Sequence, residues 1–187
     1  FIAYNYNTPI ETDEFDTEAS RILEEVEAEC GWVYSTLHNP DKKEIETLSK
    51  FVRESSIDDL KSLIGCENKN IDPLLGKPEF GRINFILWSD VFVCPECSSE
   101  IIFWDIAVKD GAIEKILEEF PCPNCGVQLT KRNMAHAFTT EFDEATHDTV
   151  QQLKQVPVRI NYSIEKKRFE KTPDAYDLEI IKKLEHH

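Results

Sequence analysis

The centre of the chain contains two short, similar sequences, Cys94-Pro95-Glu96-Cys97 and Cys122-Pro123-Asn124-Cys125-Gly126. A disulfide within either pair would close a very small loop, and such loops seldom serve as structural cross-links. Two C-x-x-C pairs in one chain instead favour four thiolates around one metal ion. We therefore predict a metal site formed by Cys94, Cys97, Cys122 and Cys125.

The spacing of these residues also predicts how the two pairs are arranged. In a C-x-x-C unit the two middle residues turn the chain, so both sulfurs lie on one side, where backbone N–H groups can donate to them. Gly126 tolerates the left-handed conformation that follows such a turn, whereas Ser98 stands at that place in the first pair, where we expect a less tight turn. The twenty-four residues between Cys97 and Cys122 can hold a strand, a turn and a return, which is the layout of a zinc ribbon.

Structural Zn²⁺ is the ion that this ligand set predicts, because four thiolates fill its tetrahedral coordination and leave no position for a reacting water. Iron is an alternative, since paired C-P-x-C-G turns also hold the single iron of rubredoxins. Four reduced cysteines without metal are a second alternative, which would leave the small strands without a cross-link. His38, His136 and His147 fit no ligand spacing, and we expect them at the surface or packed in a core.

Charge and hydropathy restrict the partners of the chain. Its 187 residues are 41% apolar and carry a net charge of −15. Residues 1–80 hold eighteen acidic and eight basic side chains, whereas residues 126–171 hold six and eight. The acidic part would repel phosphate, so any contact with a DNA duplex is expected from the last third. The sequence contains no run of eighteen apolar residues that could span a membrane, so we expect no membrane partner.

The two ends and the cysteines bear on origin and location. The start, Phe1-Ile2-Ala3-Tyr4, has neither an initiator methionine nor a basic, apolar leader, and it indicates an excerpt from a longer protein. Leu184-Glu185-His186-His187 resembles the remnant of a purification tag. Reduced cysteine pairs together with the missing leader predict a cytoplasmic protein.

Apolar periodicity predicts the elements around the cysteines. A helical stripe over residues 12–30 is expected in a core, with Cys30 as a core thiol, and Asn39-Pro40 indicates the start of a second helix. A third, shorter helix is expected over 57–64. After Gly81 the period changes to two, which predicts a strand that runs into Cys94 and a second strand over 101–108. Later strands are expected from 127, over 138–142 and over 156–164, followed by a closing helix capped by residues 172–174.

These elements predict an α+β fold: a four-cysteine zinc ribbon with antiparallel β-hairpins, flanked by helices. We expect an acidic helical region over 1–80, the zinc ribbon over 81–135, an antiparallel sheet with its closing helix over 136–183, and the tag remnant over 184–187.

No catalytic constellation is recognisable in the sequence. It contains no glycine-rich nucleotide loop, no G-x-S-x-G and no H-E-x-x-H, so we predict no catalytic residue. A modest basic patch in the last third predicts contact with nucleic acid, unless these cations only balance nearby acids. The candidate contact residues are Lys131, Arg132, Lys166, Lys167 and Arg168.

The chain resembles the adenine-specific DNA methylases that contain a zinc ribbon, over nearly its whole length except residues 38–80, which look like an insertion. The similar stretches are Phe1-Ile2-Ala3-Tyr4-Asn5-Tyr6-Asn7-Thr8-Pro9, Glu29-Cys30-Gly31-Trp32, Trp88-Ser89-Asp90-Val91-Phe92-Val93-Cys94-Pro95-Glu96-Cys97, Glu100-Ile101-Ile102-Phe103-Trp104-Asp105, Phe120-Pro121-Cys122-Pro123-Asn124-Cys125-Gly126, Leu129-Thr130-Lys131-Arg132, Lys154-Gln155-Val156-Pro157-Val158, Ile160-Asn161-Tyr162 and Lys171-Thr172-Pro173-Asp174.

This resemblance implies a parent enzyme that uses S-adenosylmethionine to methylate an exocyclic amine of adenine in double-stranded DNA, as restriction-modification methyltransferases do. The family's cofactor loop and its D-P-P-Y-type catalytic motif are both absent from these residues, so only the four cysteines carry over. The leading hypothesis is a zinc-ribbon insert that serves as a scaffold and contacts the target duplex. The alternative is a ribbon that docks a partner protein, for instance a restriction subunit, without binding DNA.

Overall fold

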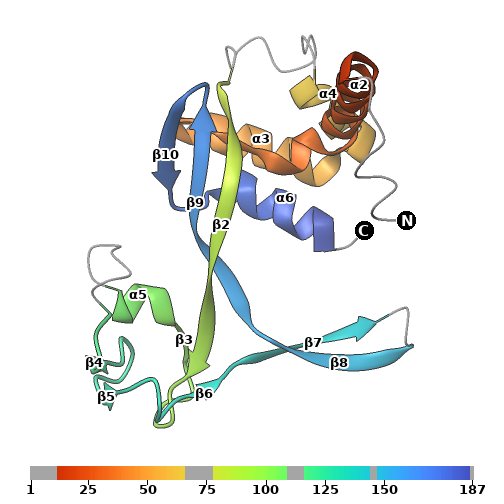
Figure 1. Ribbon diagram of the computed structural model, residues 1–187. Helices are drawn as coiled ribbons and strands as arrows, with labels where there is room; N and C mark the ends of the chain where they lie inside the picture. Colours follow the sequence, from red (N-terminus) through yellow and green to blue (C-terminus); the bar gives the residue numbers. More distant parts are fainter. Residues whose placement is uncertain (1–11, 66–77, 109–115, 144–146, 186–187) are drawn as a thin grey trace. The chain divides into compact units, whose positions relative to one another are not determined.

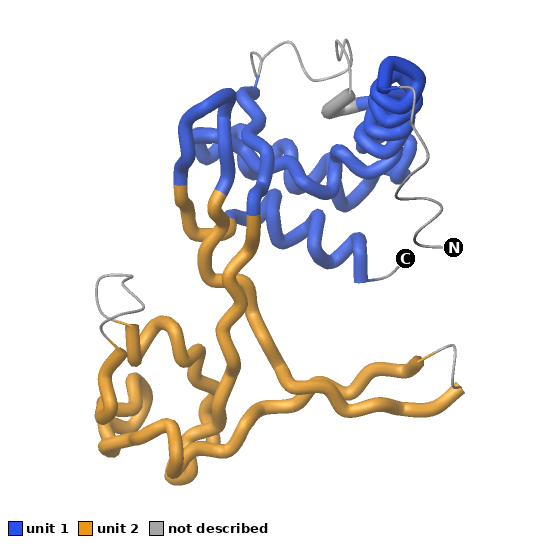
Figure 2. Tube along the Cα trace, viewed as in Figure 1, with its two compact units in different colours: residues 1–84, 162–169, 174–187 blue, residues 85–161, 170–173 orange. Residues whose placement is uncertain are grey.

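The computed structural model describes residues 12–65, 78–108, 116–143 and 147–185 (Figure 1). These residues mix α-helices with antiparallel strands, so the predicted α+β class is confirmed. The chain divides into two compact units (Figure 2). Unit 1 contains residues 1–84, 162–169 and 174–187, and unit 2 contains residues 85–161 and 170–173.

Helices make up most of the described part of unit 1. They are α2 (Thr12–Cys30), the 3₁₀ helix η1 (Gly31–Tyr34), α3 (Lys42–Glu54), α4 (Ile57–Gly65) and α6 (Ala175–Glu185). Helices α3 and α6 pack against each other, and η1 contacts α4. Buried side chains of η1, α3, α4 and α6 form one apolar cluster with strand β1 (Ser35–Leu37), namely Trp32, Leu37, Leu48, Val52, Leu60, Tyr176 and Ile180.

Polar side chains define where these helices begin. Asp41 accepts a hydrogen bond from the backbone N–H of Glu44 while the Glu44 carboxylate accepts one from the Asp41 N–H, which is a capping box. The predicted start at Asn39-Pro40 was therefore two residues early: the cap is Asp41, and Asn39 has a left-handed φ of 45° ahead of it. Asp174 caps α6, as predicted, by accepting from the N–H of Tyr176 and of Asp177.

Helix α2 forms where the periodicity predicts it, but the expected burial of its apolar stripe is wrong. None of its residues is buried, and Cys30 is exposed instead of being a core thiol. The core of unit 1 is already filled by side chains of η1, β1, α3, α4 and α6.

One sheet contains most of the longer strands. Its order is β1-β2-β9-β10, formed with β2 (Phe80–Val93), β9 (Gln155–Ile164) and β10 (Lys167–Lys171). Strand β2 pairs antiparallel with β1 near its start, where Ser35 lies opposite Arg82. Near its end β2 pairs antiparallel with β3 (Glu100–Ile102) and with β6 (Ala135–His136).

The ribbon part of unit 2 follows the end of β2. Strand β3 leads directly into the short helix α5 (Phe103–Ala107), and β4 (Phe120–Pro121) pairs antiparallel with β5 (Gln128–Leu129). The predicted strand over 101–108 is thus wrong beyond Ile102. Helical spacing places Phe103 and Ala107 on one side of α5, against the same apolar cluster that holds Phe92 and Phe120, and this packing overrides the strand preference of the sequence.

A two-stranded hairpin completes unit 2. Strand β7 (Phe138–Asp143), which was predicted, pairs antiparallel along its full length with β8 (Asp148–Leu153), which was not. Strand β8 contains only two apolar residues among polar ones, so its alternation gives a weak signal in the sequence.

Candidate metal centre

Two turns bring the four cysteines together in unit 2. The first turn carries Cys94 and Cys97 between the end of β2 and the start of β3, and the second carries Cys122 and Cys125 between β4 and β5. Each turn therefore stands between two paired strands, which hold it in place. The four sulfur atoms all lie within 4.8 Å of one another.

The two turns have the same backbone hydrogen bonds. In the first, the N–H of Ser98 donates to the carbonyl of Cys94 over 2.9 Å, and the N–H of Cys94 donates to the carbonyl of Ser99. In the second, Gly126 and Val127 make the same two bonds with Cys122, at 2.9 and 2.8 Å. Ser98 and Gly126 are both left-handed, with φ of 57° and 76°. The expectation of a looser first turn is therefore wrong, because Ser98 adopts the conformation that glycine adopts in the second.

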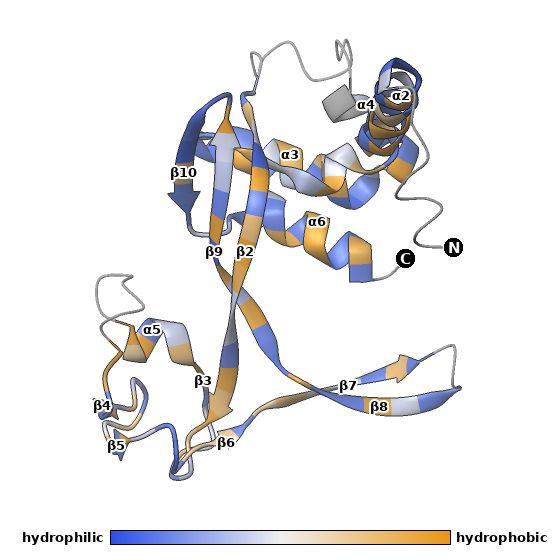
Figure 3. Cartoon of the chain, viewed as in Figure 1, coloured by the Kyte–Doolittle hydropathy of each residue, from blue (hydrophilic) through white to orange (hydrophobic). Residues whose placement is uncertain are grey.

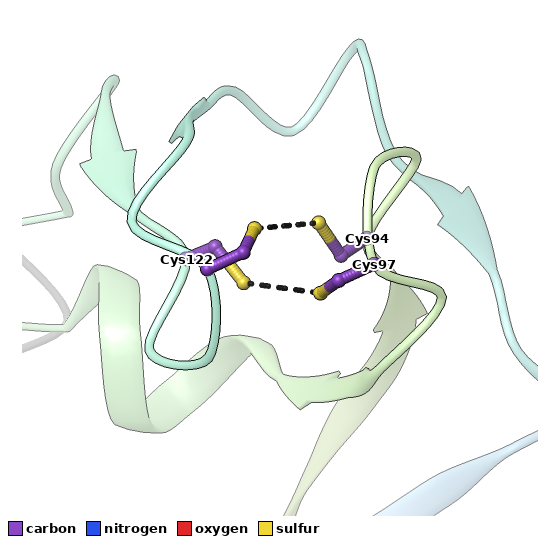
Figure 4. A group of neighbouring side chains, drawn as sticks. Cys94, Cys97 and Cys122 are labelled. Atoms are coloured by element: carbon purple, nitrogen blue, oxygen red, sulfur yellow. Dashed lines mark hydrogen bonds between the residues drawn. The ribbon is translucent and has the colours of Figure 1, made fainter.

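The distances between sulfurs fit a tetrahedral metal site. Figure 4 shows the two cysteine turns facing each other. Cys94 Sγ lies 3.8 Å from Cys125 Sγ, and Cys97 Sγ lies 3.8 Å from Cys122 Sγ. A disulfide would need about 2.05 Å. Four sulfurs at about 2.3 Å from a zinc ion stand about 3.8 Å apart at the corners of a tetrahedron. The observed arrangement is compatible with one metal ion held by four thiolates.

Apolar packing covers one side of the cluster. Cys94 and Cys122 are buried among Phe92, Ile101, Phe120 and other side chains of the ribbon core, whereas Cys125 is exposed. The site thus has an inner pair of sulfurs inside the apolar cluster and an outer part that reaches the surface.

Local hydrogen bonds and desolvation shift the pKa values of three of these thiols in different directions. Donors from Asn124 and Ser99, including the Ser99 hydroxyl 3.0 Å away, lower the pKa of Cys97 to about 5. Backbone N–H groups, first that of Cys125, lower the pKa of Cys122. At Cys125 the backbone N–H of Val127 favours the thiolate, but desolvation and the neighbouring sulfurs raise the pKa to about 12. Neighbouring thiolates repel one another, which opposes the ionisation of all four thiols together, and a bound divalent cation offsets that repulsion.

The remaining candidate ligands lie elsewhere. Among the described residues, the four cysteines are the one group of cysteine, histidine or carboxylate side chains close enough to hold a metal ion. His136 packs against the ring of Phe92, and His38 bonds to the hydroxyl of Tyr162 over 2.9 Å. His38 is half-buried, whereas His136 and His147 are exposed, so all three positions agree with the expectation of surface or packed residues. Cys66 falls outside the described residues.

The residues predicted to contact nucleic acid are distributed over both units. Lys131 and Arg132 belong to unit 2, where the Lys131 ammonium lies 5.1 Å from the centre of the Phe103 ring. Lys166, Lys167 and Arg168 belong to unit 1, where Lys166 lies in the turn between β9 and β10 and the other two begin β10. All five are exposed, and none forms an ion pair with another residue in the part of the chain that the structure describes.

Comparison of this chain with known protein families, with curated proteins and with solved structures finds no match. Its functional assignment therefore depends on its own residues and on the geometry of the cysteine cluster.

Among the described helices, none combines the length and the apolar character needed to cross a bilayer.

Proposed function

We propose that Cys94, Cys97, Cys122 and Cys125 hold one structural Zn²⁺ ion and that this ion stabilises the ribbon of unit 2. The observation that supports the proposal is the pair of 3.8 Å sulfur–sulfur distances between two turns with matching hydrogen bonds. The bound ion would cross-link the β2–β3 pair to the β4–β5 pair. Strands β4 and β5 have only two residues each. Four protein ligands complete the coordination, so the role is structural.

Metal analysis of the purified chain tests this assignment. We expect one zinc per chain by elemental analysis, and loss of that zinc in the variant Cys97→Ser/Cys122→Ser. Cys30→Ser is the matched control, because Cys30 lies outside the cluster and is exposed. A folded protein without metal would contradict the proposal. Intense visible absorption with one iron per chain would support the rubredoxin-like alternative.

We further propose that this module belongs to an S-adenosylmethionine-dependent, adenine-specific DNA methyltransferase of the restriction-modification type. The support is the similarity of sequence described above, which runs through both cysteine turns. The cofactor and the catalytic residues would be supplied by other parts of the parent enzyme, and the ribbon would act as a scaffold near the DNA. Enzymes that modify a base extrude it from the duplex, and an accessory domain can hold the distorted duplex. The expected location is the cytoplasm.

We also propose that the module contacts DNA directly. The exposed cations Lys166, Lys167 and Arg168, in the β9–β10 turn and at the start of β10, support this contact. Residue colouring shows that β10 is largely hydrophilic (Figure 3). We expect Lys166→Ala/Lys167→Ala/Arg168→Ala to lower the affinity for a DNA duplex by about tenfold or more and to reduce its salt dependence, since each phosphate contact releases counterions. The stability of the chain toward unfolding should be unchanged.

A matched control keeps the change in net charge the same. Lys42, Lys43 and Lys50 are three exposed cations of α3, and their replacement by alanine should leave duplex affinity within about twofold. Equal losses in both triple variants would show a non-specific charge effect. No duplex affinity at low salt would favour a docking module for a partner protein, such as a restriction subunit.

A further inference from the structure

Among the described residues, helix α2 contacts the rest of unit 1 through its last turns. The indole N–H of Trp32 donates to the carbonyl of Glu29 over 3.2 Å, and the Glu27 carboxylate pairs with Arg82 at 2.9 Å. Lys61 forms an ion pair with Glu29 as well. Before these contacts, the helix continues for four turns in which no side chain is buried.

The exposed part of α2 carries a regular apolar seam. Phe15, Ala19, Ile22 and Val26 follow one another at intervals of four, three and four residues, which is the a/d spacing of a coiled coil. Phe15 is 61% exposed, Ile22 47% and Val26 53%, and the neighbouring Leu23 is 69% exposed. A helix of this length takes most of its stability from packing of its apolar face. Within the described residues, the seam therefore has no packing partner of the kind that such a helix normally has.

The charges beside the seam indicate the nature of that partner. Residues 12–30 contain eight acidic side chains and one arginine, for a net charge of −7. Glu18 and Glu25 occupy the g positions and Asp16 an e position, next to the seam. Arg21, which pairs with Glu18 and Glu25, is the one basic residue of the helix. Two copies of α2, each with a net charge of −7, would repel one another, and an antiparallel pair would also set the g-position glutamates against each other. Lysine or arginine at the facing positions would instead be complementary.

We propose that the apolar seam of α2 docks an amphipathic helix of a partner protein whose flanking positions are basic, as a two-stranded coiled coil. This surface is separate from the cysteine cluster, which lies in unit 2, and it does not depend on the identity of the metal. Helix α2 would thus bind a partner protein, and it contributes no buried side chain to the core that the described residues form.

A designed peptide provides a direct test on the full chain. The probe is a three-heptad helix with leucine at a and d and lysine at e and g, and the control peptide has glutamate at e and g. Affinity is measured by titration calorimetry at low and high salt. We expect the lysine peptide to bind, more weakly at high salt, and the glutamate peptide to bind at least about tenfold more weakly.

Two double variants locate the binding surface. Ile22→Gln/Val26→Gln removes two seam residues and keeps a good helix former at each position, and it should weaken binding of the lysine peptide by about tenfold or more. Ser20→Gln/Ala28→Gln changes the opposite face of α2 and should leave the affinity within about twofold. Circular dichroism confirms that both variants keep their helix content.

Three outcomes would overturn the proposal. The first is no binding of the lysine peptide at about millimolar concentration. The second is an equal loss of affinity in both double variants. The third is a concentration-dependent dimer in sedimentation analysis that Ile22→Gln/Val26→Gln abolishes, because the occupant of the seam would then be a second copy of this chain.

Discussion

Ser98 and Gly126 occupy equivalent positions in the two cysteine turns, and both have positive φ. A left-handed conformation costs a residue with a side chain roughly 1–2 kcal/mol, whereas glycine adopts it freely. A Cβ at Gly126 would meet no atom within 4 Å, so substitution there changes conformation without a steric clash. The first turn thus carries backbone strain that the second lacks.

Exchange of these two residue types should change stability in opposite directions. We expect Ser98→Gly to stabilise the metal-loaded chain by about 0.5–1 kcal/mol and Gly126→Ala to destabilise it by about 1 kcal/mol, measured by urea unfolding at saturating zinc. Ser98→Ala keeps the strain and should be close to neutral. A stability gain in Ser98→Ala equal to that in Ser98→Gly would assign the effect to the hydroxyl.

Tyr176 makes the stability of unit 1 depend on pH in the alkaline range. Its side chain is fully buried, and its hydroxyl lies 3.0 Å from Ser35 Oγ. Burial, supported by the charges of Asp177 and Asp174, raises the pKa of Tyr176 above its usual value near 10 despite the hydrogen bond with Ser35. The fold therefore favours the neutral form, so its contribution to stability is complete below about pH 10 and is lost as the pH rises further.

The test compares two phenylalanine variants between about pH 8 and 11. Tyr176→Phe should flatten the alkaline loss of stability, because the ionisable group is gone, whereas Tyr34→Phe, at a half-exposed tyrosine, should retain the profile of the unchanged chain. Chemical unfolding at each pH measures the difference. Identical profiles in both variants would refute the role of Tyr176.

At the level of elements, the start of β2 has a close contact that requires glycine. A Cβ at Gly81 would lie 2.3 Å from Cδ2 of Tyr162, whose ring is buried in strand β9. We expect Gly81→Ala to destabilise the chain by about 1–3 kcal/mol, since a buried aromatic ring held by a hydrogen bond to His38 cannot easily move.

Gly31→Ala provides the matched control in thermal and urea unfolding. Its Cβ would approach Glu27 Oε1 at 3.0 Å, and that atom is the end of an exposed, flexible side chain. The expected change is within about 0.5 kcal/mol. Similar destabilisation by both substitutions would mean that the Tyr162 contact is not responsible.

For the whole molecule, the division into two units predicts that metal removal acts locally. Unit 1 has its own apolar core around Trp32, Leu48 and Tyr176, whereas unit 2 packs its core around the cysteine cluster. We expect chelation of zinc to increase amide exchange by about tenfold or more over the described parts of residues 94–129, while α3 and α6 keep their protection.

Hydrogen exchange with mass spectrometry measures this difference by segment. The variant Cys97→Ser/Cys122→Ser should show the same pattern without chelator, which separates loss of metal from other effects of the reagent. Simultaneous loss of protection in α3 and α6 would show that the two units unfold together, against this prediction.

The elements that were predicted correctly are those specified by local chemistry. The cysteine turns depend on residues within each C-x-x-C pair, and α6 begins where the Asp174 side chain can cap it. The α+β class follows from the change of apolar period near Gly81. In each case the interacting groups are close along the chain, so the pattern of residues is sufficient. The predicted limits at residues 80, 135 and 183 stay predictions.

Other features depended on which surfaces meet in three dimensions. An apolar stripe has the same periodicity whether or not a core is available to it, so the exposure of α2 and of Cys30 could not be read from spacing. Phe103 and Ala107 became helical because that conformation directs both toward the ribbon core, where Ala107 is fully buried. Ser98 is left-handed because the strands on either side hold its turn. Contacts between residues distant in sequence made these choices, since their packing free energy exceeds the small local preferences that the sequence encodes.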